Sequence, residues 1–524
     1  MKRGSRIITL CLCGLLLLCG CEQPGDPPPA PSETLTPDPT PTPTASSQPT
    51  RFSLGYDPTA SLHPITGDSQ VNQELTGLVY QGLYELDNTF SPRPVLARSA
   101  SVSENGLVWA FTLAADAVFS DGTPLTAAHA AASLNRARTS PVYAARLAAV
   151  TSVTARDGAV HITLSAPNGN LPALLDIPIV LEQEPAEDGT VPPTPLGTGY
   201  YRYEQAGDQL YLQANPYHRA AAALPYISIP LTPVSDTGMR IAAFDSGEIT
   251  AVTTEFSSPY ALSYSGSYES TDYPTTSLLY VGFNTINGVC QSPLVRQAFS
   301  RALDRRSLAD VLLAEHGDPA ALPVSPLCGE YSQAAAAQRE YDLDAAAQLL
   351  AEAGYTLNEE DGLLYRRNTP VTVTLLVNSD NDVRQSAARQ FARALESLGV
   401  TVTVSRLPWN NFTAALAGGQ FDLYLGEVRL TGDFDPSVLL TGELNYGGFE
   451  NETLALALAQ WRAARGAART QAAGALWEQF VQNAPIAPVC FMRGSLLMRW
   501  GVAFHLQPTR ANPYYQIESW TIPG

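Results

Sequence analysis

A long run rich in proline limits which part of this chain can fold. Residues 22–50 contain ten prolines, six threonines, four acidic residues and no lysine or arginine. Proline removes backbone donors and holds φ near the value of the polyproline II helix, so the segment is expected to stay extended. It also has too little apolar surface to offset the entropy lost on folding. We therefore expect a disordered stalk, about 90 Å long at full stretch, and a folded body that begins near Arg51.

The residues before the stalk have the layout of an export signal. Three basic residues form a positive start, and residues 7–20 are apolar or small throughout. Such a run is too short to span a bilayer comfortably, which takes about 20 apolar residues, and it matches the short apolar core of a secretory signal. Residues 18–21, Leu-Cys-Gly-Cys, resemble a bacterial lipobox, in which the last cysteine receives diacylglycerol. We expect residues 1–20 to be removed and Cys21 to carry a lipid that anchors the protein outside the cytoplasm. Cleavage without lipidation and an uncleaved anchor are the alternatives.

The body, residues 51–524, is about 474 residues long, which predicts two or three lobes rather than one simple core. The formal net charge of the chain is −19, and it becomes −22 when the three basic residues of the signal are lost. An acidic domain of this kind is a poor nucleic-acid binder, because such binding needs clustered lysine and arginine. No later segment approaches the length of a membrane span.

The hydrophobic pattern of the body predicts an α/β fold. Residues 371–377, VTVTLLV, are β-branched and apolar enough for a buried strand, and a helical pattern follows on one face from Val383 to Leu398. Gly399 ends that helix and a second strand begins at Val400, which together predict a βαβ unit. Asp342 is placed to cap another helix, and residues 127–138 predict an alanine-rich helix between short strands.

The search for catalytic or metal-binding motifs is negative. The sequence contains no HExxH, GxSxG or Walker motif, and residues 197–199 form only a GxG in a proline-rich loop. The histidines are scattered and never paired at i, i+4: His63, His129, His161, His218, His316 and His505. We therefore expect no enzyme activity, no cofactor and no metal site.

Three cysteines remain in the body, namely Cys290, Cys328 and Cys490, and none is arranged for zinc. Because an exported protein meets an oxidising environment, one disulfide can form. Cys290 and Cys328 lie in loop-like stretches and are predicted to pair, while Cys490 lies in an apolar run and is predicted to stay buried and reduced.

Several sequence blocks, which follow one another along the body, resemble the conserved blocks of a known family. The first block, residues 76–138, contains "GLVWAFTL" and "FSDGTPLTA", and residues 195–203 read "PLGTGYYRY". Later blocks are "VRQAFSRALDRR", "YDLDAAAQLLAEAGY" and "APIAPVCF". Together they resemble the extracytoplasmic solute-binding proteins of ABC importers, in the family that includes oligopeptide-, dipeptide- and nickel-binding members.

The resemblance implies a two-lobed α/β fold of the periplasmic-binding-protein type (type II) with an extra subdomain inserted in lobe I. Lobe I is expected to span residues 51–281 and 489–524, with lobe II at 282–488 and hinges at the two crossings. A small solute, most simply a short peptide, would bind in the cleft between the lobes, which would close around it. The implied partner is a membrane permease, and the protein is expected to act as a monomer.

The resemblance also points to a ligand carboxylate. In dipeptide-binding relatives a "GW..D" segment before a "DP" supplies the carboxylate for the peptide's amino group, and Asp433 is the best match here. The tryptophan is absent, however, and a single residue separates Asp433 from Asp435. Asp433 is therefore interpreted either as an anchor for a solute ammonium group or as a residue that only shapes a turn.

The remaining candidates lie where strands end or helices begin. Glu427 and Arg429 follow a predicted strand and would contact ligand or pair with each other, with Arg429 a candidate for a solute carboxylate. Trp409 and Asn410 precede a helix, and Tyr56 follows the first strand, which is a frequent cleft position in α/β folds.

Two alternatives belong to other functional classes. A surface-anchored hydrolase would need a nucleophile or a metal cluster, and neither is found in the sequence. A sensor or chaperone that reuses the binding fold without transport would differ in its neighbouring genes, where a sensor kinase would replace a permease.

Overall fold

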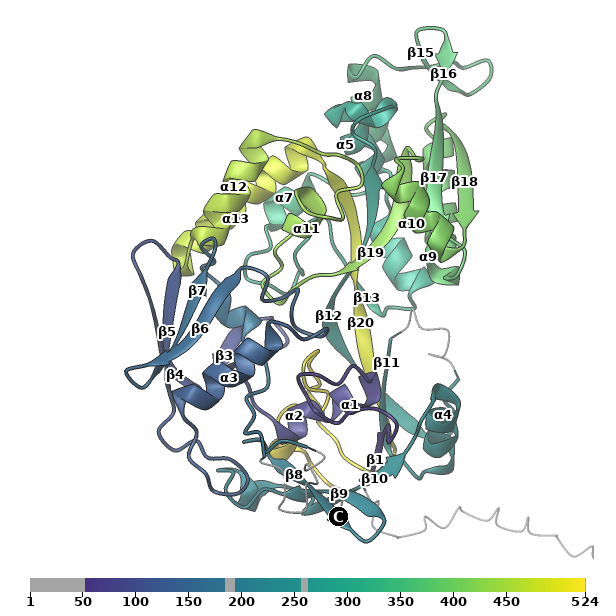
Figure 1. Cartoon of the computed structure of the whole chain (residues 1–524). Coiled ribbons are helices and arrows are strands. Elements are labelled where there is room, and N and C mark those ends of the chain that lie inside the picture. Colours follow the sequence, from purple (N-terminus) through teal and green to yellow (C-terminus); the bar gives the residue numbers. More distant parts are fainter. Residues whose placement is uncertain (1–51, 184–193, 256–262, 524) are drawn as a thin grey trace, which may run out of the picture. The chain divides into compact units, whose positions relative to one another are not determined.

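We analysed a computed structural model of the chain, which describes residues 52–183, 194–255 and 263–523 (Figure 1). The chain divides into two units, residues 1–49 and 50–524, and the described residues all belong to the second. The predicted signal, Cys21 and the stalk lie outside the described residues. Within the described stretches, no helix is long and apolar enough to cross a membrane.

One mixed seven-stranded sheet connects distant parts of the sequence. Its strands are β11 (Ala251–Glu255), β20 (Ile486–Arg499), β12 (Tyr268–Phe283), β19 (Leu423–Arg429), β17 (Thr372–Asn378) and β18 (Thr401–Leu407) in spatial order, with β13 (Gly317–Pro319) on β20. The two long strands β12 and β20 pair antiparallel, and Figure 1 shows them side by side between β11 and β19. The far end of the sheet is the predicted βαβ unit.

That unit is confirmed in its elements and pairing. Strand β17 lies parallel to β18, and α9 (Asp382–Glu396) connects them. The buried face of α9 includes Ala387, Phe391 and Leu395, and Gly399 follows the helix with φ of +83°. The predicted cap at Asp342 is also confirmed, because its side chain accepts from Ala345 N at the start of α8 (Leu343–Glu352).

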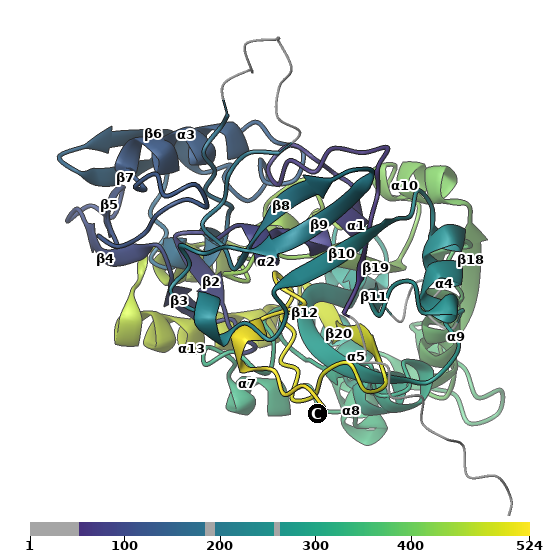
Figure 2. The same cartoon turned by 90° about the horizontal axis from the view of Figure 1, so that it is seen from below.

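Smaller sheets form most of the N-terminal half. One consists of β1 (Leu54–Tyr56), β10 (Ser228–Pro233), β9 (Gln209–Ala214) and β8 (Tyr201–Ala206), and Figure 2 shows its strands side by side. Another consists of β4 (Ala97–Val102), β5 (Val108–Leu113), β7 (Ala159–Leu164) and β6 (Val150–Arg156). The alanine-rich helix α3 (Ala127–Ala137) packs on β6 and β7, where the sequence predicted a helix between strands.

Short elements and surface helices complete the described chain. The helices are α1 (Gln70–Glu74), α2 (Thr76–Val79), α4 (Thr237–Ser246), α5 (Pro293–Arg301), α6 (Arg305–Ser307), α7 (Gln333–Ala337), α10 (Trp409–Ala417), α11 (Ser437–Leu440), α12 (Glu452–Ala463) and α13 (Gly466–Asn483). The short strands are β2 (Tyr84–Leu86), β3 (Pro92–Pro94), β14 (Thr356–Leu357), β15 (Leu364–Arg366) and β16 (Thr369–Pro370).

Separate hydrophobic cores define the two lobes. One core combines β1, β5, β7 and β10 with the C-terminal residues Tyr514 and Trp520, and we call the part built around it lobe I. Two further cores lie on either side of the sheet at β12, β17 and β19, and we call the part built around them lobe II. Side chains of β12 join the lobe II cores from Leu278 onward. The sequence-based boundaries at 281/282 and 488/489 lie inside β12 and β20 and stay predictions.

The predicted Cys290–Cys328 disulfide is not present. Both residues are free thiols in the structure, and they lie in different environments. Cys290 is buried in the core that includes α5, whereas Cys328 packs at the edge of the core that includes α12 and its Sγ lies 3.6 Å from the Thr89 carbonyl. The disulfide was predicted because both cysteines lie in loop-like stretches of the sequence. The fold instead places them at separate hydrophobic cores, so they do not meet. Cys490 is fully buried, as predicted.

Candidate functional site

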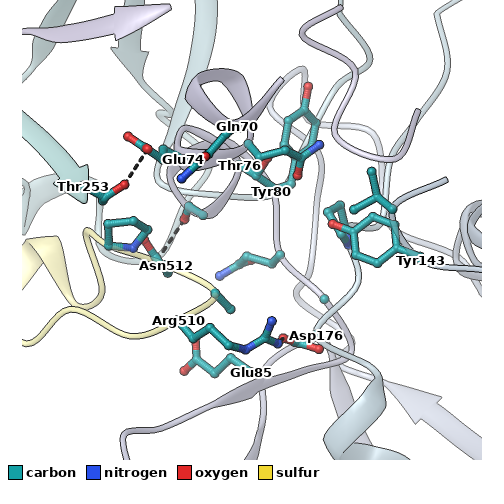
Figure 3. A pocket seen from close by; sticks show the side chains of 18 of the residues that line it. Gln70, Glu74, Thr76, Tyr80, Glu85, Tyr143, Asp176, Thr253, Arg510 and Asn512 are labelled. Atoms are coloured by element: carbon teal, nitrogen blue, oxygen red, sulfur yellow. Dashed lines mark hydrogen bonds and ion pairs between the residues drawn. The ribbon is translucent and has the colours of Figure 1, made fainter. Parts of the chain in front are cut away.

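A cavity of about 420 Å³ lies where lobe I faces the end of β19 (Figure 3). Lobe I supplies most of its wall, from α1 and α2, from β2, from residues 142–178 and from the C-terminal segment 510–513. Strands β11 and β12 contribute residues 253–255 and 273–275, and β19 contributes Arg429. The wall carries five carboxylates and three guanidinium groups, so the cavity is strongly polar.

The carboxylate of Glu74 pairs with an arginine outside the cavity lining. Glu74 is the last residue of α1, and its two oxygens accept from Arg240 Nη2 at 2.8 and 2.6 Å. Thr253 Oγ1 on β11 also donates to Glu74, at 2.5 Å. Because both partners of this pair are only 10% exposed, the attraction is screened little by solvent. Glu74 therefore serves mainly to hold α1 against β11 and α4.

A second carboxylate serves two arginines. Asp176 is 5% exposed, and its Oδ1 accepts a short hydrogen bond from Arg146 Nη1. Its Oδ2 accepts from Arg510 Nη2 at 3.4 Å, across 334 positions of sequence. Figure 3 shows the side chains of Arg510 and Asp176 pointing toward each other at the edge of the cavity. Burial lowers the pKa of Arg510, and Asp176 opposes that shift.

Arg429 approaches from lobe II. It is the last residue of β19, and its guanidinium donates to Glu255 at 2.6 Å and to Ser277 Oγ at 3.3 Å. The side chain is 59% exposed, so it can change partners at little cost. Among the three arginines of the wall, Arg429 is the one that lobe II contributes.

Buried titratable groups complete the wall. Burial raises the pKa of Glu85 on β2, while a hydrogen bond from Tyr515 opposes the rise. Burial likewise raises the pKa of Tyr143 to about 12, so this phenol stays a neutral donor. His218 packs against Tyr200 from outside the cavity lining, and burial and Arg219 lower its pKa to about 4. The cavity wall thus combines neutral hydrogen-bonding groups with carboxylates and guanidiniums, of which Asp176 pairs with Arg146 and Arg510 and Glu255 pairs with Arg429.

Among the described residues, the cavity wall shows no catalytic arrangement of the kinds searched for in the sequence. No serine or cysteine nucleophile lines the cavity beside a histidine base. Among the described residues, no group of three or more histidine, cysteine, aspartate or glutamate side chains is placed to hold a metal ion. Charged groups of both signs around one cavity are chemically suited to a small solute that carries both charges.

The structure brings one of the predicted site residues, Arg429, to the cavity. Glu427 lies two residues earlier on the same strand, and it accepts from Arg384 Nη2 at 2.5 Å and from Arg384 Nε at 3.2 Å. The alternative that Glu427 and Arg429 pair with each other is therefore wrong. Glu427 pairs with Arg384 of α9, the helix that connects β17 and β18 on one side of β19. Arg429 pairs with Glu255 of β11, which lies on the other side of β19 in the sheet.

Asp433 is buried away from the cavity lining. It is 6% exposed, and its Oδ2 accepts from Asn168 Nδ2 at 2.9 Å while its Oδ1 accepts from Thr431 Oγ1 at 2.6 Å. The neighbouring Asp435 pairs with Arg462 at 3.0 Å, and burial followed by the charge of Asp433 raises the pKa of Asp435. Both oxygens of Asp433 are thus occupied by the chain itself, which favours a structural interpretation of this residue over an anchor for a solute.

The other three candidates lie outside this cavity lining. Trp409 and Asn410 begin α10 and are exposed, and the Trp409 ring packs beside Phe412. Tyr56 ends β1 and packs against the lobe I core. Their contact with a solute stays a prediction.

Sequence reasoning missed Glu74, Glu85, Arg146, Asp176 and Arg510. Glu85 lies in the first family block without being marked by it, and the others lie in no motif; their partners come from other segments, as for Arg510 and Asp176. The one available signal is weak: an arginine three residues before a proline in the C-terminal segment, in a chain with few basic residues.

Comparisons with known proteins point to one family. Residues 91–447 match the family model described as bacterial extracellular solute-binding proteins, family 5 middle. The glutathione-binding protein GsiB of Salmonella typhimurium is 27% identical over 398 residues, which cover 72% of this chain and 74% of that protein. The oligopeptide-binding protein AppA of Bacillus subtilis is 28% identical over 234 residues, covering 41% of this chain and 40% of AppA.

Solved structures have the same fold. The murein tripeptide-binding protein MppA in its unliganded open form superposes with a TM-score of 0.74 at 21% identity, covering 91% of this chain and 98% of MppA. HbpA2 from Haemophilus parasuis superposes with a TM-score of 0.70 at 20% identity, covering 90% of this chain and 99% of that chain. The predicted type II periplasmic-binding-protein fold is thereby confirmed.

Proposed function

Because this chain belongs to family 5 of the bacterial extracellular solute-binding proteins, we propose that it captures a short peptide or a similar small solute and delivers it to the permease of an ABC importer. The observation that carries the proposal is the cavity of about 420 Å³ with charged groups of both signs in its wall. Ligand pockets commonly measure about 300–1,000 Å³. A short peptide carries an ammonium and a carboxylate, and each needs an opposite charge when water is excluded.

The names of the relatives support this solute class. GsiB is named for glutathione, AppA for oligopeptides and MppA for a murein tripeptide, and all three are peptides or peptide-like. The family consists of binding proteins that act outside the cytoplasm. The protein is accordingly a receptor and not an enzyme.

A lipid on Cys21 would tether this receptor near its permease. The supporting observations are the apolar run that ends at a lipobox-like sequence and the proline-rich segment after it. An extended segment of 29 residues would allow the body to move between solution and the membrane surface.

A thermal-shift screen tests the solute class. The panel contains glutathione, di- and tripeptides, an oligopeptide pool, sugars and nickel with histidine. A solute at 100 times its dissociation constant should add about 2.7 kcal/mol to the free energy of unfolding. Stabilisation by sugars alone would contradict the peptide proposal, and chemical turnover of a bound peptide would contradict the receptor role.

A blocking substitution tests whether the cavity is the site. Val142 lines the cavity and is 38% exposed, so Val142→Trp should fill part of the space with little effect on stability. We expect at least about tenfold weaker binding, because steric exclusion removes contacts worth more than about 1.4 kcal/mol. The matched control is Val311→Trp at a residue that is 78% exposed and outside the cavity lining. Equal affinities in the two variants would place the solute elsewhere.

A further inference from the structure

The three arginines of the cavity wall have fewer partner carboxylates than their charges require. Arg146 and Arg510 share the single carboxylate of Asp176. Their side chains are 15% and 21% exposed, and Asp176 is 5% exposed. Two guanidiniums and one carboxylate leave one positive charge uncompensated in a poorly hydrated place, which is costly unless an anion joins them.

Arg510 also has hydrogen-bonding capacity left. Its Nε atom is buried and has no hydrogen-bond partner within the described residues, and its bond to Asp176 is long at 3.4 Å. A guanidinium presents its donors in one plane, a geometry that matches the two oxygens of a carboxylate. Arg510 is therefore prepared to donate to a further oxyanion.

The other carboxylates of the wall do not supply that anion. Glu74 is already paired with Arg240, and Asp68 is exposed to solvent and pairs with none of the three arginines in the described part of the chain. Glu85 forms no ion pair with Arg146, Arg429 or Arg510 in the described part of the chain, and the hydrogen bond that moderates its pKa comes from Tyr515. Glu255 is engaged with Arg429.

Arg429 of lobe II lines the same cavity as Arg146, Asp176 and Arg510 of lobe I. Its charge is close enough to contribute to the lowered pKa of Arg510, after burial and the effects of Asp176 and Arg146. Arg429 is mainly exposed and bound to Glu255, which is 30% exposed. An exposed ion pair of this kind contributes little, so Arg429 can turn toward an anion in the cavity.

We propose that Arg510 and Arg146 of lobe I, together with Arg429 of lobe II, form a subsite for a carboxylate of the solute. The bound carboxylate compensates the surplus charge beside Asp176 and links the two lobes through Arg429. The proposal rests on the proposed function in that it assigns the subsite to a transported solute, and it restricts the solute class to molecules that carry an anionic group.

Acetate tests the subsite without knowledge of the solute. The melting temperature of the ligand-free protein is measured in acetate and in chloride at equal ionic strength and pH 7. We expect a higher melting temperature in acetate for the unchanged protein and no difference for Arg510→Gln. The control Arg156→Gln removes an exposed arginine that is paired with Asp157 outside the cavity, and it should keep the acetate effect. Since Arg510→Gln can impair folding, Arg429→Gln on the exposed side is tested in parallel and should reduce the effect.

A pair of peptides tests the same subsite with a solute-like probe. Binding of trialanine is compared with binding of its C-terminal amide. In the unchanged protein the amide should bind about tenfold or more weakly, because a charge-assisted contact is lost. In Arg510→Gln the two should bind alike.

The outcomes separate this subsite from the receptor role. Equal melting in acetate and chloride, or an acetate effect that survives in both Arg510→Gln and Arg429→Gln, would overturn the subsite. A solute without an anionic group that binds tightly would overturn it as well and leave the receptor role intact. A protein that shows the acetate effect but binds no solute of the panel would keep the subsite and contradict the proposed function.

Discussion

At the level of single residues, the partner of a charged side chain decides its role. Asp176 lies in the cavity wall because two arginines from distant segments meet it there, whereas Asp433 is covered by Asn168 and Thr431. Both aspartates are almost fully buried. A carboxylate that faces a cavity can act on a solute, and one whose oxygens are taken by the chain acts on stability.

Replacing Asp433 with asparagine tests its structural role. The amide would keep one acceptor and lose the charge, so one of the two bonds at 2.6 and 2.9 Å weakens in a buried place. We expect the free energy of unfolding to fall by about 1–3 kcal/mol, with solute affinity nearly unchanged, as measured by denaturation and calorimetry. The control Asp157→Asn, at an exposed position, should change stability by less than about 0.5 kcal/mol. Intact stability with affinity reduced by roughly 3–5 kcal/mol would instead establish Asp433 as the ammonium anchor.

Glu85 should make stability depend on pH. Burial raises its pKa in the folded protein above the ordinary value of 4.5. Between the two pKa values the folded protein holds more protons than the unfolded chain, so stability falls as pH rises through that window. Relative to Glu85→Gln, the unchanged protein should therefore lose stability as the pH increases from about 4.5, which denaturation at several pH values measures. An exposed control, Glu396→Gln, should follow the unchanged protein. A constant difference between Glu85→Gln and the unchanged protein at all pH values would contradict this assignment.

At the level of elements, the connection between the lobes is a pair of strands whose register changes. Strands β12 and β20 pair regularly from Tyr268 to Pro274, and their register then shifts twice, between Pro274 and Leu278 and between Leu279 and Tyr280. Across the first shift Thr275 Oγ1 donates to the Met492 carbonyl of β20 at 2.5 Å, while Thr276 Oγ1 donates at 2.7 Å to the carbonyl of Leu430, which follows β19. A break in the ladder where the lobes meet is a suitable place for a hinge.

Thr275→Val tests this connection. Valine keeps the shape of threonine and removes the buried hydroxyl, so the free energy of unfolding should fall by about 1 kcal/mol. The same substitution at the exposed Thr372 of β17 should be nearly neutral. Denaturant titration of both variants checks the difference. If the two variants lost the same amount, the hydroxyl of Thr275 would have no role in joining the strands.

At the level of the whole molecule, the N-terminal 50 residues and the body differ in how much apolar surface they can bury. The body buries several hydrophobic cores. Residues 22–50 contain ten prolines and almost no large apolar side chain, so they cannot form such a core. The body therefore carries the cavity proposed to bind the solute, and we propose that the N-terminal region anchors the protein.

Cys21→Ala should release the protein from the membrane or leave its signal uncleaved, because lipid attachment at this cysteine is the proposed step before cleavage. Fractionation of cells and mass spectrometry of the N-terminus measure both results. The control Cys19→Ala changes the other cysteine of the lipobox-like sequence to a small residue that is usual there, and it should stay anchored. A processed Cys21→Ala protein that remained on the membrane would contradict the lipoprotein proposal.

Local sequence determined the elements of this protein. The βαβ unit at residues 372–407, the cap at Asp342 and the helix α3 follow from alternation, capping and glycine at helix ends, which act over a few residues. The family blocks, which follow one another in order along the body, also indicate the fold, and the match to the family model confirms the family. Of the site, sequence reasoning found Arg429 alone.

Tertiary structure decided which charges meet. Arg510 reaches Asp176 across 334 positions, and Asn168 covers Asp433 across 265. Tertiary structure likewise decided the environment of Cys290 and Cys328. Both lie in loop-like stretches of the sequence, but the fold places them at two separate hydrophobic cores. Periodicity and spacing describe what a side chain does within its own helix or strand, and they carry no information on which distant segment packs against it. The wall of the cavity is made of segments that lie far apart in the sequence, so its composition is settled only when the sheets and the C-terminal segment pack together.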